Sequence, residues 1–166
     1  MSLMRRLMKR NDPTTRTESA TVRAILSQLE ALDEPTARFI AAFAYVLARV
    51  AAADLEIDKE EEAAMERILL DLDTIEDEHV SLVLSIAREQ AREHGGTEDY
   101  LATREFRNLS DRDDRIRLLR ALLRVAAADG HVSEIESQEI VRIAGELDFN
   151  EDELKALRRD LRDSAS

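Results

Sequence analysis

An internal repeat constrains the fold of this chain more than any other feature. The segment 43–78 aligns without a gap with the segment 118–153, and 15 of the 36 aligned positions are identical. Both copies contain the run Arg-Val-Ala-Ala-Ala-Asp, which begins at Arg49 and again 75 residues later at Arg124. Two copies are too few for an open solenoid. We therefore expect two similar units that pack face to face with a pseudo-twofold relation.

The residue pattern inside the copies is helical. Apolar residues recur at spacings of three and four, as in Phe39, Phe43, Val46, Leu47 and Val50. Ala, Leu, Arg and Glu dominate, whereas the chain has only four Gly, two Pro and 4% aromatic residues, which argues against a β-sandwich or barrel. We predict an all-α fold, a compact bundle of seven to eight helices. Its single domain spans 18–166, with repeat copies at about 35–94 and 110–163, and a basic tail precedes it at 1–17.

Capping signals predict where the helices begin. Pro35 suits a first helical turn, so the sequence predicts a helix from there to about Asp54, after an earlier helix that ends near Leu32. Capping boxes, in which a small polar residue is followed three positions later by an acidic one, predict five further starts. These pairs are Asp58 with Glu61, Thr74 with Asp77, Ser110 with Asp113, Ser133 with Glu136, and Asn150 with Glu153.

Composition excludes several classes of function. The chain has no Cys, so disulfides, thiolate chemistry and Cys-based zinc sites are excluded, and a reducing cytoplasm fits. A net charge of −12 repels nucleic-acid phosphates, and no basic face appears in the main body, so we predict no nucleic-acid partner. No apolar stretch has the roughly 18 to 20 residues that a membrane-spanning helix needs. The sequence also lacks a Gly-rich phosphate loop and a nucleophile elbow, and we predict no enzymatic activity.

The first ten residues differ in charge from the rest of the chain. They hold four of its 24 basic residues, with apolar residues between them; the sequence is Met-Ser-Leu-Met-Arg-Arg-Leu-Met-Lys-Arg. Such a basic amphipathic pattern is typical of segments that rest on an anionic membrane surface. Terminal segments are also commonly frayed tails. Peripheral membrane contact through Met1–Arg10 and a tail without function are both open at this stage.

A ten-residue motif links the sequence to a known family. The second copy reads Ala-Ala-Asp-Gly-His-Val-Ser-Glu-Ile-Glu from Ala127 to Glu136, and a looser version spans Ala52 to Glu61. This pattern resembles the TerB-like family of tellurite-resistance proteins, which also includes the N-terminal region of the DjlA membrane co-chaperone. The resemblance covers roughly Pro35 to Arg162. In the first copy, Leu55 stands where the family has Gly.

The resemblance implies an all-helical, non-enzymatic stress or tellurite-resistance module, often near the inner membrane face, with acidic surface residues that bind a divalent metal. Carried over by position, the implied ligands are Asp54, Asp58, Glu61, Asp129 and Glu136. Clustered carboxylates suit a hard cation such as calcium or manganese, and His131 adds a nitrogen for a softer one such as zinc. Because Gly130 is kept only in the second copy, we expect the metal chemistry around Asp129.

Two other interpretations compete with metal binding. The same Asp, Ser and Glu side chains suffice as helix caps, which need no metal. Alternatively, the acidic runs 56–62 and 71–78 form docking faces of an adaptor for a basic protein partner, although charge runs are usually solvated surface. Glu76 and His79 have the i, i+3 spacing of a di-iron ligand pair, but the second copy has Leu154 in place of His79. We therefore predict that this pair lies in a solvated first turn.

Overall fold

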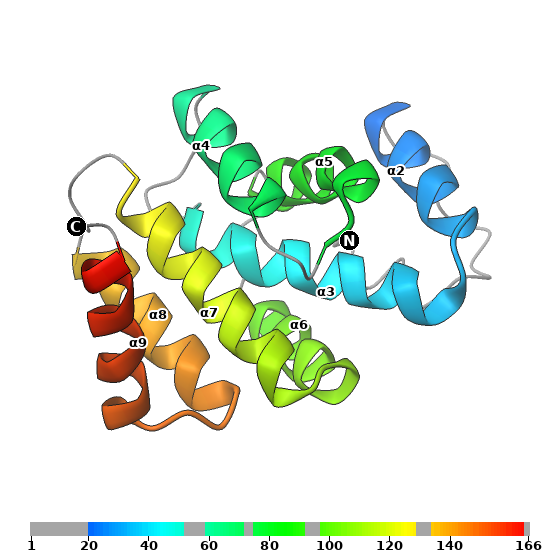
Figure 1. The fold of residues 1–166 in the computed structure, drawn as a ribbon. Coiled ribbons are helices and arrows are strands. Elements are labelled where there is room, and N and C mark those ends of the chain that lie inside the picture. The colour runs from blue at the N-terminus through cyan, green and yellow to red at the C-terminus, as the bar shows by residue number, and fades with distance from the viewer. Residues whose placement is uncertain (1–19, 52–58, 72–74, 92–96, 129–133, 165–166) are drawn as a thin grey trace.

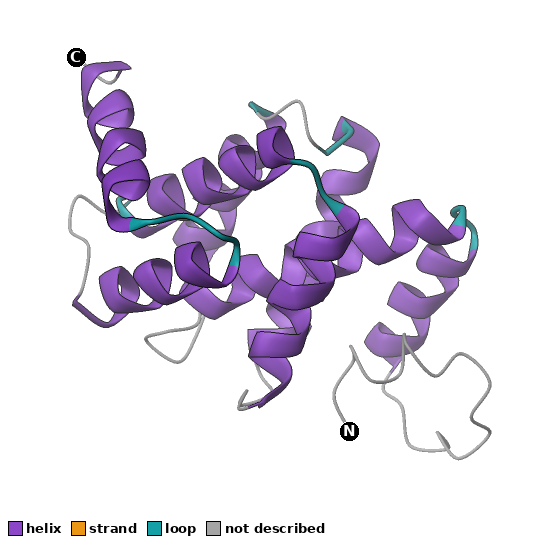
Figure 2. Ribbon diagram, turned by 90° about the horizontal axis from the view of Figure 1, so that it is seen from below, coloured by secondary structure: helices purple, strands orange, loops and turns teal. Residues whose placement is uncertain are grey.

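The computed structural model describes residues 20–51, 59–71, 75–91, 97–128 and 134–164 (Figure 1). Every secondary-structure element in these ranges is helical (Figure 2). The predicted all-α bundle of seven to eight helices is therefore confirmed. The elements are α2 (Ala20–Glu30), α3 (Glu34–Ala51), α4 (Lys59–Leu70), the 3-10 turn η1 (Asp77–His79), α5 (Val80–Ala91), α6 (Thr97–Leu109), α7 (Arg112–Ala126), α8 (Glu134–Glu146) and α9 (Glu151–Ser164).

Helix α3 runs through the centre of the bundle. It packs against α5 on one side and α6 on the other, and it also contacts α7 and α8 (Figure 1). Every residue from Ile40 to Ala48 is buried, so the helix has no polar face along its middle. The predicted apolar stripe forms only part of this surface. Four alanines fill the remaining faces, where small side chains allow close packing: Ala41, Ala42, Ala44 and Ala48.

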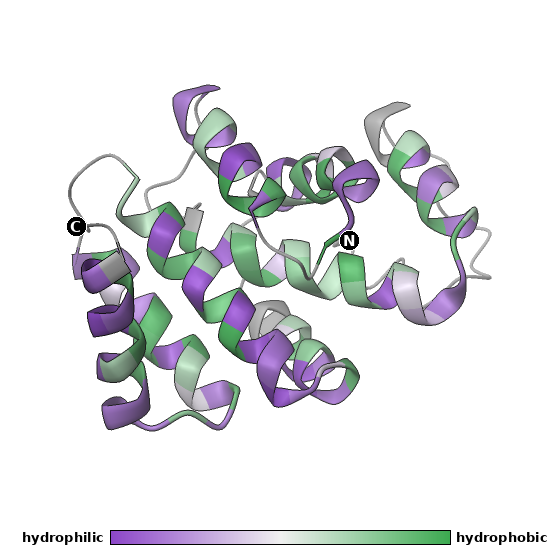
Figure 3. Ribbon diagram, in the orientation of Figure 1, coloured by the Kyte–Doolittle hydropathy of each residue, from purple (hydrophilic) through white to green (hydrophobic). Residues whose placement is uncertain are grey.

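The outer helices have the opposite character. Helix α9 is largely hydrophilic, whereas the middle of α3 is hydrophobic (Figure 3). Helix α9 buries a stripe at Leu154 and Leu157, three positions apart on one face. Among the described helices, none combines the length and the apolar character that crossing a bilayer requires.

The capping predictions have mixed outcomes. Asn150 and Glu153 form the predicted box, with the Glu153 amide donating to Asn150 Oδ1 at 2.8 Å and the Asn150 amide to Glu153 Oε1 at 3.1 Å. The box predicted at Ser110 is wrong by one residue. Helix α7 is capped by Asp111 with Asp114, because the Ser110 hydroxyl instead donates to the Phe106 carbonyl of α6. The boxes that start at residues 58, 74 and 133 lie outside the described residues.

Contacts between the two sequence copies are reciprocal. Helix α3 contacts α8, and their counterparts at the 75-residue offset, α7 and α4, contact each other. Side-chain ion pairs between the two copies are reciprocal in the same way. Arg49 pairs with Glu146 at 2.6 Å, and Arg124 pairs with Asp71 at 3.0 Å. Each arginine thus binds an acidic residue of the other copy, as is expected for units related by a twofold axis.

Arg49 has additional partners that Arg124 lacks among the described residues. Its Nε donates to Glu139 Oε1 at 2.7 Å, and its Nη1 donates to the buried Thr103 hydroxyl at 2.6 Å. The Arg49 side chain is only 4% exposed, against 37% for Arg124. A buried guanidinium is costly unless it is both paired and hydrogen-bonded. This network therefore ties α3 to α6 through Thr103 and to α8 through two glutamates.

We predict that Arg49→Ala lowers the free energy of unfolding by about 3 kcal/mol. The substitution removes the buried cation shared by two largely buried carboxylates, of which Glu139 keeps only a pair with the exposed Arg142 at 3.3 Å. Arg124→Ala is the matched control, and we expect it to cost less than about 1 kcal/mol because its ion pair is exposed. Urea unfolding followed by circular dichroism measures both. Equal losses for the two variants would contradict the role given to the network.

A second prediction concerns Asp33, which precedes α3. Its Oδ2 accepts hydrogen bonds from the Thr36 hydroxyl at 2.8 Å and the Thr36 amide at 3.1 Å. These bonds, the hydroxyl first, lower the pKa of Asp33. A carboxyl whose pKa is lower in the folded state stabilises the fold above its unfolded pKa, and this contribution is lost as the pH falls through the folded pKa.

Asp33→Ala should therefore lower the melting temperature by a few degrees at neutral pH. The difference from the parent protein should begin to shrink as the pH drops below about 4, the ordinary pKa of an Asp carboxyl. It should shrink further until the folded carboxyl is protonated at its lowered pKa. Asp33→Asn keeps an acceptor oxygen, so it should retain most of the stability throughout. Thermal melts of the three proteins across this pH range provide the measurement, and a deficit of Asp33→Ala that is independent of pH would refute the prediction.

Candidate functional site

The predicted metal ligands are only partly within the described residues. Asp54, Asp58 and Asp129 lie outside them. Glu61 lies in the first turn of α4, and Glu136 lies in the first turn of α8; both are partly exposed. Both positions suit an acidic residue because the N-terminal end of a helix carries partial positive charge.

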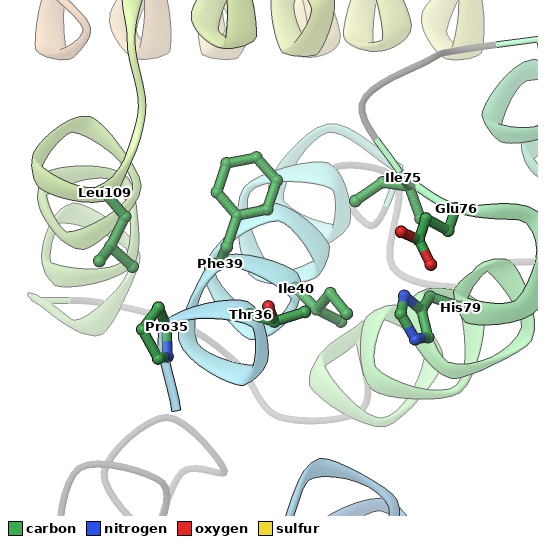
Figure 4. A pocket seen from close by; sticks show the side chains of 8 residues that line it. All are labelled: Pro35, Thr36, Phe39, Ile40, Ile75, Glu76, His79 and Leu109. Atoms are coloured by element: carbon green, nitrogen blue, oxygen red, sulfur yellow. The ribbon is translucent and has the colours of Figure 1, made fainter. Parts of the chain in front are cut away.

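A pocket opens elsewhere, where the central helix begins. Its volume is about 340 Å³, and it is bounded by the first turns of α3, the segment that leads into η1, and the end of α6 (Figure 4). Five of the eight lining residues are apolar, so the surface is mostly hydrophobic with a polar edge. The lining consists of Pro35, Thr36, Phe39, Ile40, Ile75, Glu76, His79 and Leu109.

Local sequence determines the α3 side of the pocket. Pro35 fixes the backbone of the first helical turn, and the Asp33 cap holds Thr36 in place. One turn further, Phe39 is partly exposed toward the pocket, while Ile40 is buried beneath it. The exposed start of α3 thus passes into its buried middle within a few residues, and the pocket lies at this boundary.

An aromatic cluster supports the pocket from α6. The Phe39 and Phe106 rings are 5.2 Å apart between centroids, and Phe106 also packs edge-on against Phe43 at 5.9 Å. Phe43 and Phe106 are fully buried. Tilted and edge-on ring pairs at these distances are favourable, so Phe39 is anchored from below although it borders the pocket.

Three potential ligands lie together at the polar edge. One ligand atom each from Glu76, Glu78 and His79 lies within 4.8 Å of the others. The His79 Nε2 is 3.7 Å from Glu78 Oε1, and the Glu76 carboxylate and the imidazole lie beside each other (Figure 4). Both glutamates are exposed, whereas the His79 side chain is 16% exposed. Within the described ranges, no other three His, Asp or Glu side chains form such a group, and neither Glu61 nor Glu136 belongs to it.

This arrangement differs from the one predicted for Glu76 and His79. The first turn of an α-helix was expected there, but Asp77–His79 form a 3-10 turn and α5 begins only at Val80. The His79 amide donates to the Glu76 carbonyl at 2.8 Å, and this bond closes the turn. Glu76 is the extended residue that caps the turn and His79 is its last residue, so the hydrogen bond holds the two ends of the turn close together. The spacing was the available signal, but the contribution of Glu78 could not be inferred from it.

The chemistry available to this group is metal coordination. Two carboxylates and one imidazole are a mixed oxygen and nitrogen donor set, which suits zinc or manganese better than calcium. Three protein ligands leave coordination positions for water or a bound anion.

Comparison with known proteins agrees with this architecture. The family model described as tellurite resistance protein TerB matches residues 39–159, which is most of the chain. No curated protein and no solved structure matches significantly. The match includes Phe39, Ile75, the group of Glu76, Glu78 and His79, and both aligned segments of the repeat, 43–78 and 118–153. The chain therefore belongs to the TerB family of tellurite resistance proteins.

Proposed function

We propose that this protein is a non-enzymatic, tellurite-resistance-type module that binds a divalent metal ion through Glu76, Glu78 and His79. The observation that carries the proposal is the proximity of these three ligand atoms, within 4.8 Å of one another, on a turn closed by a backbone hydrogen bond. A preformed turn reduces the entropy that would be lost on ordering the ligands around a metal. Membership of the TerB family supports the same class of function.

The donor set argues for a particular order of metals. An imidazole nitrogen favours zinc over calcium, and exposed carboxylates add charge without enclosing the ion. A site with three protein ligands and open positions fits reversible binding or presentation of an ion better than a buried structural role. We therefore propose zinc or manganese as the bound ion.

The acidic turns remain a separate proposal for the same activity. Asp129 and Glu136 are its strongest ligands because Gly130 keeps the family pattern in that copy. The two locations share no residue, so separate substitutions distinguish them. In either case we propose that the protein acts in the cytoplasm.

Isothermal titration calorimetry with zinc, manganese and calcium tests both locations. We expect saturable heat with zinc or manganese for the parent protein and its loss in the double variant Glu76→Gln with His79→Gln. The matched control, Asp129→Asn with Glu136→Gln, should keep the heat. If the control loses the heat and the first variant keeps it, the metal lies at the acidic turns instead. Absence of saturable heat with all three cations would rule out metal binding.

A second candidate function is an adaptor that binds a basic protein partner through acidic faces and needs no metal. Helix α4 favours it, because its first turn holds three consecutive glutamates, of which Glu60 is exposed and Glu62 pairs with Arg88 at 2.8 Å. Glu66, one to two turns further along α4, is also exposed. Reversing Glu60 and Glu66 to Lys should abolish capture of co-purifying partners while the helical circular dichroism spectrum is retained. Capture that survives the double reversal would contradict the use of this face.

A further inference from the structure

The pocket at the start of α3 is suited to a basic amphipathic segment. Its floor offers apolar side chains, among which Phe39 and Leu109 are only partly buried. Its edge carries the exposed carboxylates of Glu76 and Glu78. A ligand that fits both parts would place apolar side chains inside and cations at the edge, where unlike charges attract.

This chain contains a segment with that chemistry. Residues 1–10 have apolar side chains at positions 1, 3, 4, 7 and 8 and cations at 5, 6, 9 and 10. Three of the apolar residues are methionines, whose flexible thioethers adapt to irregular apolar surfaces. The whole chain has a net charge of −12, so these four cations are attracted to the remainder of the molecule.

The segment can also reach the pocket. Residue 10 is joined to the start of α2 at Ala20 by a stretch that spans up to about 33 Å when extended. Helix α2 is about 16 Å long, and its other end leads through a short turn into α3, whose first turn lines the pocket. Helix α2 also contacts α5, which η1 precedes directly. The tether is therefore longer than the helix that it must pass.

We propose that residues 1–10 dock within the same molecule into this pocket, with apolar side chains against Phe39 and Leu109 and cations against Glu76 and Glu78. Docking within one chain benefits from an effective concentration in the millimolar range, so individually weak contacts suffice to populate it. The proposal does not require a bound metal, because the two carboxylates act here only as charges.

Paramagnetic relaxation in the full-length protein tests this docking. The chain has no cysteine, so Ser2→Cys provides a unique attachment point for a nitroxide label. In EDTA and at low salt, we expect broadening of the amide signals of pocket residues such as Phe39 and His79. Reversing both carboxylates, Glu76→Lys with Glu78→Lys, should abolish this broadening. The matched control is Glu134→Lys with Glu151→Lys, an equal charge change at exposed residues outside the pocket, and it should keep the broadening.

Three outcomes would overturn the proposal. Broadening that is absent from the pocket residues, or that is spread over the whole surface, would show that the segment does not dock there. Equal loss in the control would mean that overall charge, and not this pocket, attracts the segment. Broadening that is absent in solution, together with retention of the protein by anionic phosphatidylserine vesicles and loss of retention when residues 5, 6, 9 and 10 become Gln, would assign the segment to a membrane surface instead.

Discussion

The Arg49 guanidinium lies at the place where helices α3, α6 and α8 meet. Removing a permanent charge from water is costly, and in this bundle the cost is offset by two glutamates of α8 and a buried hydroxyl of α6. The guanidinium is fully paired only when all three side chains are in place, so the network restricts how α8 can lie against α3. Hydrophobic packing alone tolerates small shifts of one helix along another, whereas hydrogen bonds to a planar guanidinium do not.

The related Arg124 shows how two similar sequences acquire different roles. Each arginine pairs with an acidic residue from the opposite copy, at Glu146 or Asp71. The position that corresponds to Glu139 in the first copy is Ala64, so Arg124 has no equivalent of that second carboxylate. One arginine is consequently enclosed and the other is exposed. The two halves share the same arrangement of helices because their sequences are similar. Differences at single positions, such as Glu139 against Ala64, decide which of the corresponding contacts are buried.

The candidate site depends on the same central helix. Helix α3 is enclosed from Ile40 onward, but its first turn, which includes Pro35 and Thr36, projects past the core. The pocket forms where this projecting turn meets η1 and the end of α6. Glu76 and His79 line this pocket beside apolar side chains, and they remain at least partly exposed to water. This combination allows a charged or metal-binding edge beside a hydrophobic surface.

Much of this protein could be predicted from its sequence, because the determining signals are local. Helix content follows from residue propensity and spacing, and the start of α9 follows from the box of Asn150 and Glu153. The family was recognisable from a short motif. The start of α7 was misplaced by one residue, since Ser110 has a suitable hydroxyl but uses it to bond the preceding helix. That choice depends on where α6 ends, which a capping rule does not include.

The all-helical class and the apolar stripe of α3 follow from the sequence, because both depend on the spacing of residues along neighbouring helical turns. The repeat follows from the sequence as well, because it appears when the chain is aligned with itself at an offset of 75 residues. Only the packed bundle shows that the middle of α3 is enclosed on every face, that Arg49 is buried while Arg124 is exposed, and that Glu76, Glu78 and His79 lie beside a pocket. Each of these features needs side chains from helices distant in sequence, or a switch from α to 3-10 geometry. Such arrangements are selected by the packing of the whole bundle, so spacing along the chain cannot specify them.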